Sequence, residues 1–429
     1  MSTHRNVELF VCGKTLWCRA VLGCVAALGC CSTLLGCANT YMTKTAGARE
    51  ALVHYQPEKA VDLLDKAFPK GPAEKDNVLF LLDKGTFFRA AKRFDESNQF
   101  LARAEKLSEA LDVASVSEEA AALFSNEGTK TYRTEDFEKL MMSVVQGLNY
   151  AEKGDEEGAL VEMRRVNQKL RKMVADEKKP YQQLAIARYL SGILYENAGD
   201  LDAAAIDYIQ AAKLQHLGLA AEPALRLAQE TGREDDYEAL LRAYPSLPHK
   251  PLLPSEGQLV VLVEMGLIVE KQSSKRNVGG DLQSTVLVVP VYPQARRTYP
   301  RVTLVVGGQS VQTEVVTSLD KVARIHLNER IDRMVAKSAA ALLVKGGIAA
   351  AVGAATRNTG LGALTFLLLA STQEADTRSW GSLPAEYQVA RLRLNPGKHV
   401  LKVRTPSRNS EHEVEIKPRR VSLLVLRLF

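Results

Sequence analysis

Small and large apolar residues recur in a fixed order along the first half of the chain, at spacings that suit paired helices rather than strands. The clearest frame consists of Gly192, Tyr195, Gly199, Leu201, Ala204, Tyr208 and Ala211. Related frames are Gly147, Tyr150, Gly154, Ala159, Met163 and Val166; Gly85, Phe88, Phe94, Leu101 and Ala104; and, more weakly, Ala48, Ala60, Leu64, Ala67 and Pro72, with a partial unit in Ala224–Ala243. Each frame predicts a helical hairpin, and hairpins must stack because one alone cannot bury its apolar face.

These frames resemble the tetratricopeptide repeat over roughly Ala46–Tyr244. The resemblance implies an N-terminal α-helical solenoid with a concave face for an extended peptide or a helix of another protein. Tyr150, Tyr195 and Tyr208 are then the candidate partner-binding residues. A generic helical bundle with coincidental matches is the alternative.

The frames are unevenly spaced, because Gly85 and Gly147 are 62 residues apart whereas Gly147 and Gly192 are 45 apart. Extra helix is therefore expected within Leu107–Phe124 and Arg164–Glu177. The pattern predicts an irregular solenoid rather than a regular superhelix.

From Gly257 onward the pattern changes to short runs of β-branched residues separated by turn-forming sequences. The predicted strands are Leu259–Val263, Thr285–Val291, Val302–Val306, Gln312–Val316, Gln388–Leu394, His399–Arg404, Glu411–Ile416 and Val421–Leu428. Polar and apolar residues alternate in 399–403, which is typical of a half-buried strand. Residues 258–429 are thus expected to form an antiparallel β-sandwich-like domain, with a barrel as the alternative, so the chain is multidomain α + β.

An Ala- and Gly-rich stretch, 331–371, interrupts these strands. Its two apolar pieces, Ala339–Ala355 and Gly360–Ala370, predict a helical hairpin insert, and neither is a convincing membrane span by length. Three interpretations stay open: a hairpin buried on the sheet, an oligomerisation surface, or a segment that contacts a membrane.

Prolines at intervals of three, from Pro245 to Pro254, separate the two halves. This spacing suits a polyproline II rod, so 245–257 is predicted to be a semi-rigid linker, with a ligand for a proline-binding domain as the alternative. The halves differ in charge, since Cys37–Pro254 has 29 Lys and Arg against 35 Asp and Glu, whereas Ser255–Phe429 has 24 against 14. The basic half could meet an anionic polymer, anionic lipid, an acidic partner, or its own acidic half.

All six cysteines lie in the first 37 residues, where a charged stretch precedes the short apolar run 20–33. This is the pattern of an export signal covering 1–36. Leu34-Leu35-Gly36-Cys37 resembles the lipobox of bacterial lipoproteins, which implies cleavage before Cys37 and lipidation of that residue. Because Ala38 is not Asp, the resemblance implies an outer-membrane protein anchored on the periplasmic face. A secretory signal or a retained membrane anchor is the alternative.

A distinctive cluster, Asp376 to Pro384, follows the insert and holds Trp380, the only tryptophan after Cys37. Asp376 and Arg378 are expected to pair and to fix the approach to Trp380, either as a structural lock with the indole in the core or as a binding site. Together with the lipobox, repeats and insert, this stretch resembles an uncharacterised family of bacterial outer-membrane repeat lipoproteins. That resemblance implies an architecture and no activity.

The sequence contains no G-x-x-x-x-G-K-[ST], H-E-x-x-H or G-x-S-x-G motif, and histidines after Cys37 are scattered and expected at the surface. No enzyme activity, metal or cofactor is predicted. The net charge of +6, from 56 basic and 50 acidic residues, is too balanced for a dedicated nucleic-acid binder.

The favoured function is a lipid-anchored scaffold that binds envelope proteins in cell-wall synthesis or envelope assembly, with peptidoglycan as a further candidate partner. The alternatives are an oligomeric membrane-associated component built on the 339–370 stretch and, less favoured, an envelope hydrolase.

Overall fold

The computed structural model describes residues 40–118, 131–177, 184–215, 217–247, 250–278, 285–294, 298–328 and 375–429. The chain divides into two compact units, Met1–Lys44 and Thr45–Phe429, and the second holds every feature discussed below except the first five residues of α2. The predicted signal peptide, Cys37 and the 331–371 insert lie outside the described residues.

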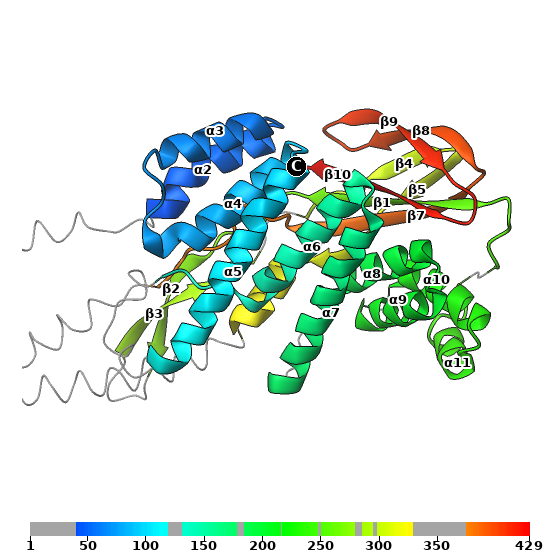
Figure 1. Cartoon of the computed structure of the whole chain (residues 1–429), viewed down its shortest axis with the longest axis horizontal. Coiled ribbons are helices and arrows are strands. Elements are labelled where there is room, and N and C mark those ends of the chain that lie inside the picture. The colour runs from blue at the N-terminus through cyan, green and yellow to red at the C-terminus, as the bar shows by residue number, and fades with distance from the viewer. Residues whose placement is uncertain are drawn as a thin grey trace, which may run out of the picture. The chain divides into compact units, whose positions relative to one another are not determined.

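Helices follow one another as hairpins through the first part of the chain (Figure 1). The pairs are α2 (Thr40–Val53) with α3 (Pro57–Ala67), α4 (Asn77–Ala90) with α5 (Phe94–Glu118), α6 (Asp136–Lys153) with α7 (Glu156–Glu177), α8 (Ala185–Ala198) with α9 (Leu201–Gln215), and α10 (Gly218–Glu230) with α11 (Glu234–Ala243). Each predicted frame therefore corresponds to one helix pair, and the helical array is confirmed.

Glycines in the first helix of a hairpin face a large side chain sixteen residues later in the second. A Cβ atom on Gly85 would lie 2.7 Å from Leu101 Cγ, and one on Gly192 would lie 2.8 Å from the Tyr208 ring. Gly147 meets Met163 in the same way. The absence of a side chain thus lets the two helices approach closely.

The uneven repeat spacing lengthens two helices. α5 has 25 residues and α7 has 22, whereas the corresponding helix α9 has 15. The predicted extra helix therefore continues these two helices, although 119–124 lies outside the described residues.

Strands follow from Gly257 and form two four-stranded sheets and a hairpin. The central sheet has the order β10 (Val421–Leu428), β1 (Gly257–Met265), β7 (Glu386–Leu394) and β6 (Glu314–Ser318). The outer sheet has the order β5 (Gln309–Gln312), β4 (Thr303–Val306), β8 (Gly397–Arg404) and β9 (Asn409–Ile416), and β2 (Gln272–Val278) pairs with β3 (Thr285–Val291).

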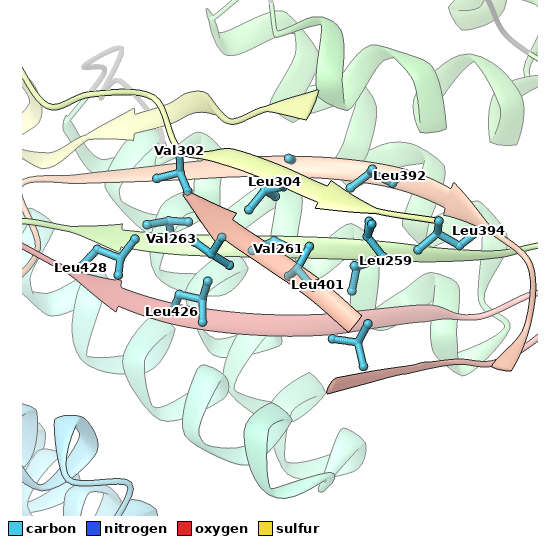
Figure 2. Packing of buried hydrophobic residues seen from close by; sticks show 14 of the residues in the cluster. Leu259, Val261, Val263, Val302, Leu304, Leu392, Leu394, Leu401, Leu426 and Leu428 are labelled. Atoms are coloured by element: carbon cyan, nitrogen blue, oxygen red, sulfur yellow. The ribbon is translucent and has the colours of Figure 1, made fainter. Parts of the chain in front are cut away.

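The two four-stranded sheets pack face to face around one apolar core, as the prediction of a sandwich requires (Figure 2). Leu259, Val261 and Val263 of β1 lie in this core with Leu304 of β4 and Leu401 of β8. On β8, Leu401 and Val403 are buried and their neighbours Val400 and Lys402 are exposed, so the strand is half-buried as predicted, although the exposed Val400 is apolar.

Two predictions about the strands are wrong. The sheets are not purely antiparallel, because β10 returns beside β1 in parallel, with Gln258 opposite Val421. The predicted strand 312–316 is split at Thr313, whose hydroxyl accepts the Val302 N–H at 2.9 Å and hydrogen bonds Gln388 Oε1 at 2.5 Å. These bonds hold the chain where it passes from the outer sheet to the central sheet.

The helices cover the other face of the central sheet. Every residue of β1 is buried, and those between the core positions, such as Glu264, point toward the helices, where Glu264 pairs with Arg89 of α4. Asn197 of α8 exchanges two hydrogen bonds with the Val421 backbone of β10, each 2.9 Å long. The central sheet is therefore a middle layer between the helices and the outer sheet.

Charge also joins the two halves. Basic side chains of the C-terminal half pair with acidic side chains of the N-terminal half in Arg378–Asp76, Lys271–Glu135, Arg391–Glu196, Arg393–Glu222 and Arg420–Glu156. The basic half thus meets its own acidic half, one of the four possibilities that the sequence left open. Arg393 also donates to the carbonyls of Lys250 and Pro251, which fixes this part of the linker to β7.

Candidate functional site

Trp380 lies at the centre of the contact between helices and strands. Its side chain is fully buried; its backbone N–H donates to Glu138 Oε1 at 3.0 Å, and its indole N–H donates to Thr86 Oγ1 at 2.9 Å. Ser382 donates to Asp83 Oδ1 at 2.6 Å. The segment after the insert is therefore bound to both α4 and α6.

Asp376 and Arg378 pair as predicted, with Arg378 Nη2 at 2.8 Å from Asp376 Oδ2. Arg378 Nη1 also donates to Asp76 Oδ1 at 2.8 Å and to the Lys75 carbonyl at 3.0 Å. Burial alone would lower the pKa of Arg378, but its bonds to Asp376 and Asp76 raise the pKa above its usual value. The guanidinium therefore stays charged and fixes the approach to Trp380.

Glu138 accepts further hydrogen bonds in this cluster besides the one from Trp380. Its carboxylate accepts from the Tyr132 hydroxyl at 2.7 and 2.8 Å and from the Glu135 N–H at 2.8 Å. Burial raises the pKa of Glu138, while Lys271, which pairs with Glu135 at 2.6 Å, opposes that rise. The sequence left a structural lock and a binding site open for this cluster, and its buried, internally bonded groups favour the lock.

Tyr208 takes part in a second buried network. Its side chain is fully buried; the hydroxyl donates to Glu196 Oε2 at 2.9 Å and accepts from Arg391 Nη1 at 2.9 Å. Burial alone would raise the pKa of Glu196, but Arg391 and Arg226 outweigh it and lower the pKa. Tyr208, proposed from the sequence to bind a partner, thus lies inside the molecule and joins α9 to β7.

Tyr150 and Tyr195 lie near the ends of α6 and α8 and are half-buried. The faces of α4, α6 and α8 that meet the strands are already occupied by the central sheet. A partner at Tyr150 or Tyr195 stays a prediction, restricted to the exposed parts of these side chains.

A groove with a volume of about 250 Å³ opens between the extended helices α5 and α7, over the start of α6. Figure 1 shows α6 lying between these two helices. Its lining residues are Glu105, Ser108, Glu109 and Asp112 of α5, Asp136, Lys139 and Met142 of α6, and Lys169, Lys172 and Met173 of α7.

The two walls of the groove carry opposite charge. The α5 wall has three carboxylates, and the α7 wall has two ammonium groups. At one end the walls are bridged, because Glu105 accepts from Lys169 and, at 2.7 Å, from Arg165 Nη2. On the floor, Lys139 of α6 pairs with Asp112 at 2.7 Å.

Sequence reasoning missed these groove residues. Their signal was present in the uneven frames, which placed extra helix where the groove now lies. Nothing in the sequence showed that the extra residues of α5 and α7 flank the same short stretch of α6. The two helices belong to separate hairpins, α4–α5 and α6–α7, so no frame within one hairpin relates them.

Within the described ranges, no group of three or more His, Cys, Asp or Glu residues could hold a metal ion. No helix in the same ranges combines the length and the apolar character needed to cross a bilayer. The expectation that histidines lie at the surface is wrong for His326, which is buried and packs edge-on against Phe137 at 6.0 Å.

The chain matches no protein family model and no curated protein in sequence. Among solved structures it is similar to the tetratricopeptide-like repeats of a putative kinesin light chain from Podosopora anserina, with 15% identity, 49% of this chain and 95% of that chain covered, and a TM-score of 0.34. It is also similar to MamA, with 14% identity, 45% and 90% covered and a TM-score of 0.30.

A tetratricopeptide repeat protein from Parabacteroides merdae gives 16% identity, 49% and 67% covered and a TM-score of 0.31. Similarities this low do not establish a fold. The hairpin array is established by the helix pairs and glycine contacts of this chain.

Proposed function

We propose that the protein is a lipid-anchored scaffold of the bacterial outer membrane that faces the periplasm and binds other envelope proteins through its helical hairpins. The observation that supports this most is the stacked array of helix pairs with one side fixed to the central sheet and the other side exposed. Stacked helical hairpins expose extended surfaces suited to protein partners. The role is one of binding and carries no catalytic step.

The anchor is proposed at Cys37, at the end of the lipobox-like sequence. One acyl chain holds a protein only weakly, whereas two or more give stable attachment, because each buried CH₂ contributes about 0.8 kcal/mol. The anchor would hold the helices at the membrane surface, where an assembly factor for the cell wall or envelope would act.

The anchor is tested by growing the bacterium with radiolabelled palmitate. The full chain is expected to take up label, and Cys37→Ser is expected to lose it. A full chain that stays unlabelled would refute the anchor and, with it, the proposed location.

Partner binding is tested by placing a photo-crosslinking amino acid at Tyr150 or Tyr195 in living cells. One envelope protein is expected to be captured at these positions and not at Glu238, whose side chain is 67% exposed on α11. Equal capture at Glu238 would show that the adducts are nonspecific.

A further inference from the structure

We propose that the groove between α5 and α7 is the docking site of the scaffold and that it takes an amphipathic helix of a partner protein, with basic residues on one flank and acidic residues on the other. This inference rests on the proposed function and names the site and the partner chemistry.

The inner face of the array is closed to such a partner. Arg391 and Glu196 pair there at 2.8 Å with only 5% of either side chain exposed, and Trp380 fills the space between α4 and α6. A partner on that face would have to displace the chain's own central sheet. The groove lies on a different side of α6: Glu138 faces Trp380, whereas its neighbour Lys139 lines the groove.

The groove is formed by the two helices that exceed the repeat length. The extra residues of α5 and α7 place their C-terminal parts on either side of α6, and the bridge from Glu105 to Lys169 and Arg165 closes one end. Both walls are helices, so the groove offers no strand edge to an extended peptide. A helix lying between them is the recognition mode that fits this shape.

The chemistry of the lining specifies the helix. Met173 is partly exposed and Met142 is buried, both line the groove, and methionine side chains adapt to apolar anchors of varied shape. Glu109 on the α5 wall and Lys172 on the α7 wall are exposed, and neither forms an ion pair with another described residue. A partner helix with an apolar stripe, a basic flank toward α5 and an acidic flank toward α7 would complement all of these groups.

The test uses the full chain and three fluorescent helical peptides of about 20 residues, which is about 30 Å of helix. All share one leucine stripe; one has a basic and an acidic flank, one has two basic flanks, and one has two acidic flanks. Reversing the direction of a helix exchanges its flanks, so single-sign peptides are the appropriate controls. The mixed peptide is expected to bind about fivefold to tenfold more tightly than either control, because several partly exposed charge pairs each contribute modestly.

Protein variants locate the site. Glu109→Lys and Lys172→Glu are each expected to weaken binding of the mixed peptide by about fivefold. Arg164→Glu is the matched control, because Arg164 is an exposed cation on α7 that does not line the groove. Equal binding of the three peptides, or an equal effect of Arg164→Glu, would overturn the proposal.

Crosslinking in cells separates this inference from the scaffold itself. A crosslinker at Lys172 is expected to capture one envelope protein. Adding Glu109→Lys to the same protein is expected to reduce that capture. Capture only from the outer sheet, for example at Lys402, would refute the groove and leave the scaffold standing. Capture from none of Lys172, Tyr150, Tyr195 and Lys402 would refute both.

Discussion

Arg391 offers the sharpest test of how the strands hold the helices. Its guanidinium reaches Glu196 Oε2 at 2.8 Å, the Tyr208 hydroxyl at 2.9 Å and Gln258 Oε1 at 2.5 Å, and only 5% of the side chain is exposed. Replacing Arg391 with Met keeps much of the volume and removes the charge. Removing one partner of a buried pair costs about 3–5 kcal/mol. Because Arg226 still pairs with Glu196, we expect the lower end, about 3 kcal/mol.

The assay is chemical denaturation of the purified protein, followed by circular dichroism at several pH values. In the native protein the lowered pKa of Glu196 means that its contribution is present above its usual value of 4.5 and is lost as the pH falls through the lower folded pKa. In Arg391→Met, only Arg226 remains to oppose the effect of burial on Glu196, so the pKa of Glu196 in the folded protein rises. The stability difference between the two proteins is therefore expected to shrink as the pH falls toward and below the usual carboxyl value of 4.5.

The control is Arg242→Met, which breaks the Arg242–Glu238 pair on α11, where both side chains are largely exposed. Exposed pairs of this kind contribute about 0.5 kcal/mol or less. If Arg391→Met cost no more than this control, or if its cost were the same at every pH, the buried Arg391–Glu196 pair would not contribute to holding β7 on α8.

Three further predictions concern single positions. Gly192→Ala is expected to lower the free energy of unfolding by about 1–3 kcal/mol in chemical denaturation, because the added Cβ would meet the Tyr208 ring. A loss smaller than that caused by an Ala→Gly change at an exposed helix position would refute close helix packing. Trp380→Phe, which loses the bond to Thr86, is expected to cost about 1–2 kcal/mol by the same assay, and no cost would contradict the lock. Burial raises the pKa of Asp320 from 3.8 to about 6, so its stabilising effect is present below pH 3.8 and is lost as the pH rises through about 6. Asp320→Asn is expected to remove up to about 3 kcal/mol of the pH-dependent change in the free energy of unfolding. A pH profile of stability unchanged by this substitution would refute the role given to Asp320.

The sequence predicts much of the local structure because the relevant contacts are short in range. Gly192 and Tyr208 lie in one hairpin, so their spacing already encodes the approach of two helices. The strand Val421–Leu428 has the predicted bounds because six of its eight residues are apolar, with only Ser422 and Arg427 polar. Strand β2, with the sequence QSSKRNV, was missed because polar residues fill it and no alternation marks it.

Long-range pairing could not be predicted in the same way. The parallel contact of β1 with β10 joins segments more than 150 residues apart, and no local pattern distinguishes it from an antiparallel one. The pair Arg378–Asp76 spans 302 residues, so the sequence predicted the neighbour Asp376 and missed the distant carboxylate. The groove was missed for the same reason, since its two walls come from separate hairpins.

The covering of the array by strands has a consequence for how such a protein can change in length. In a free-standing array each hairpin contacts only its neighbours, so units can be gained or lost with little effect elsewhere. Here Arg89 of α4 meets β1, Asn197 of α8 meets β10, and Ile186 of α8 donates to Thr317 of β6 at 3.0 Å. Inserting or deleting one hairpin would move every later helix off its strand, so the width of the sheet sets the number of repeats that the molecule can hold.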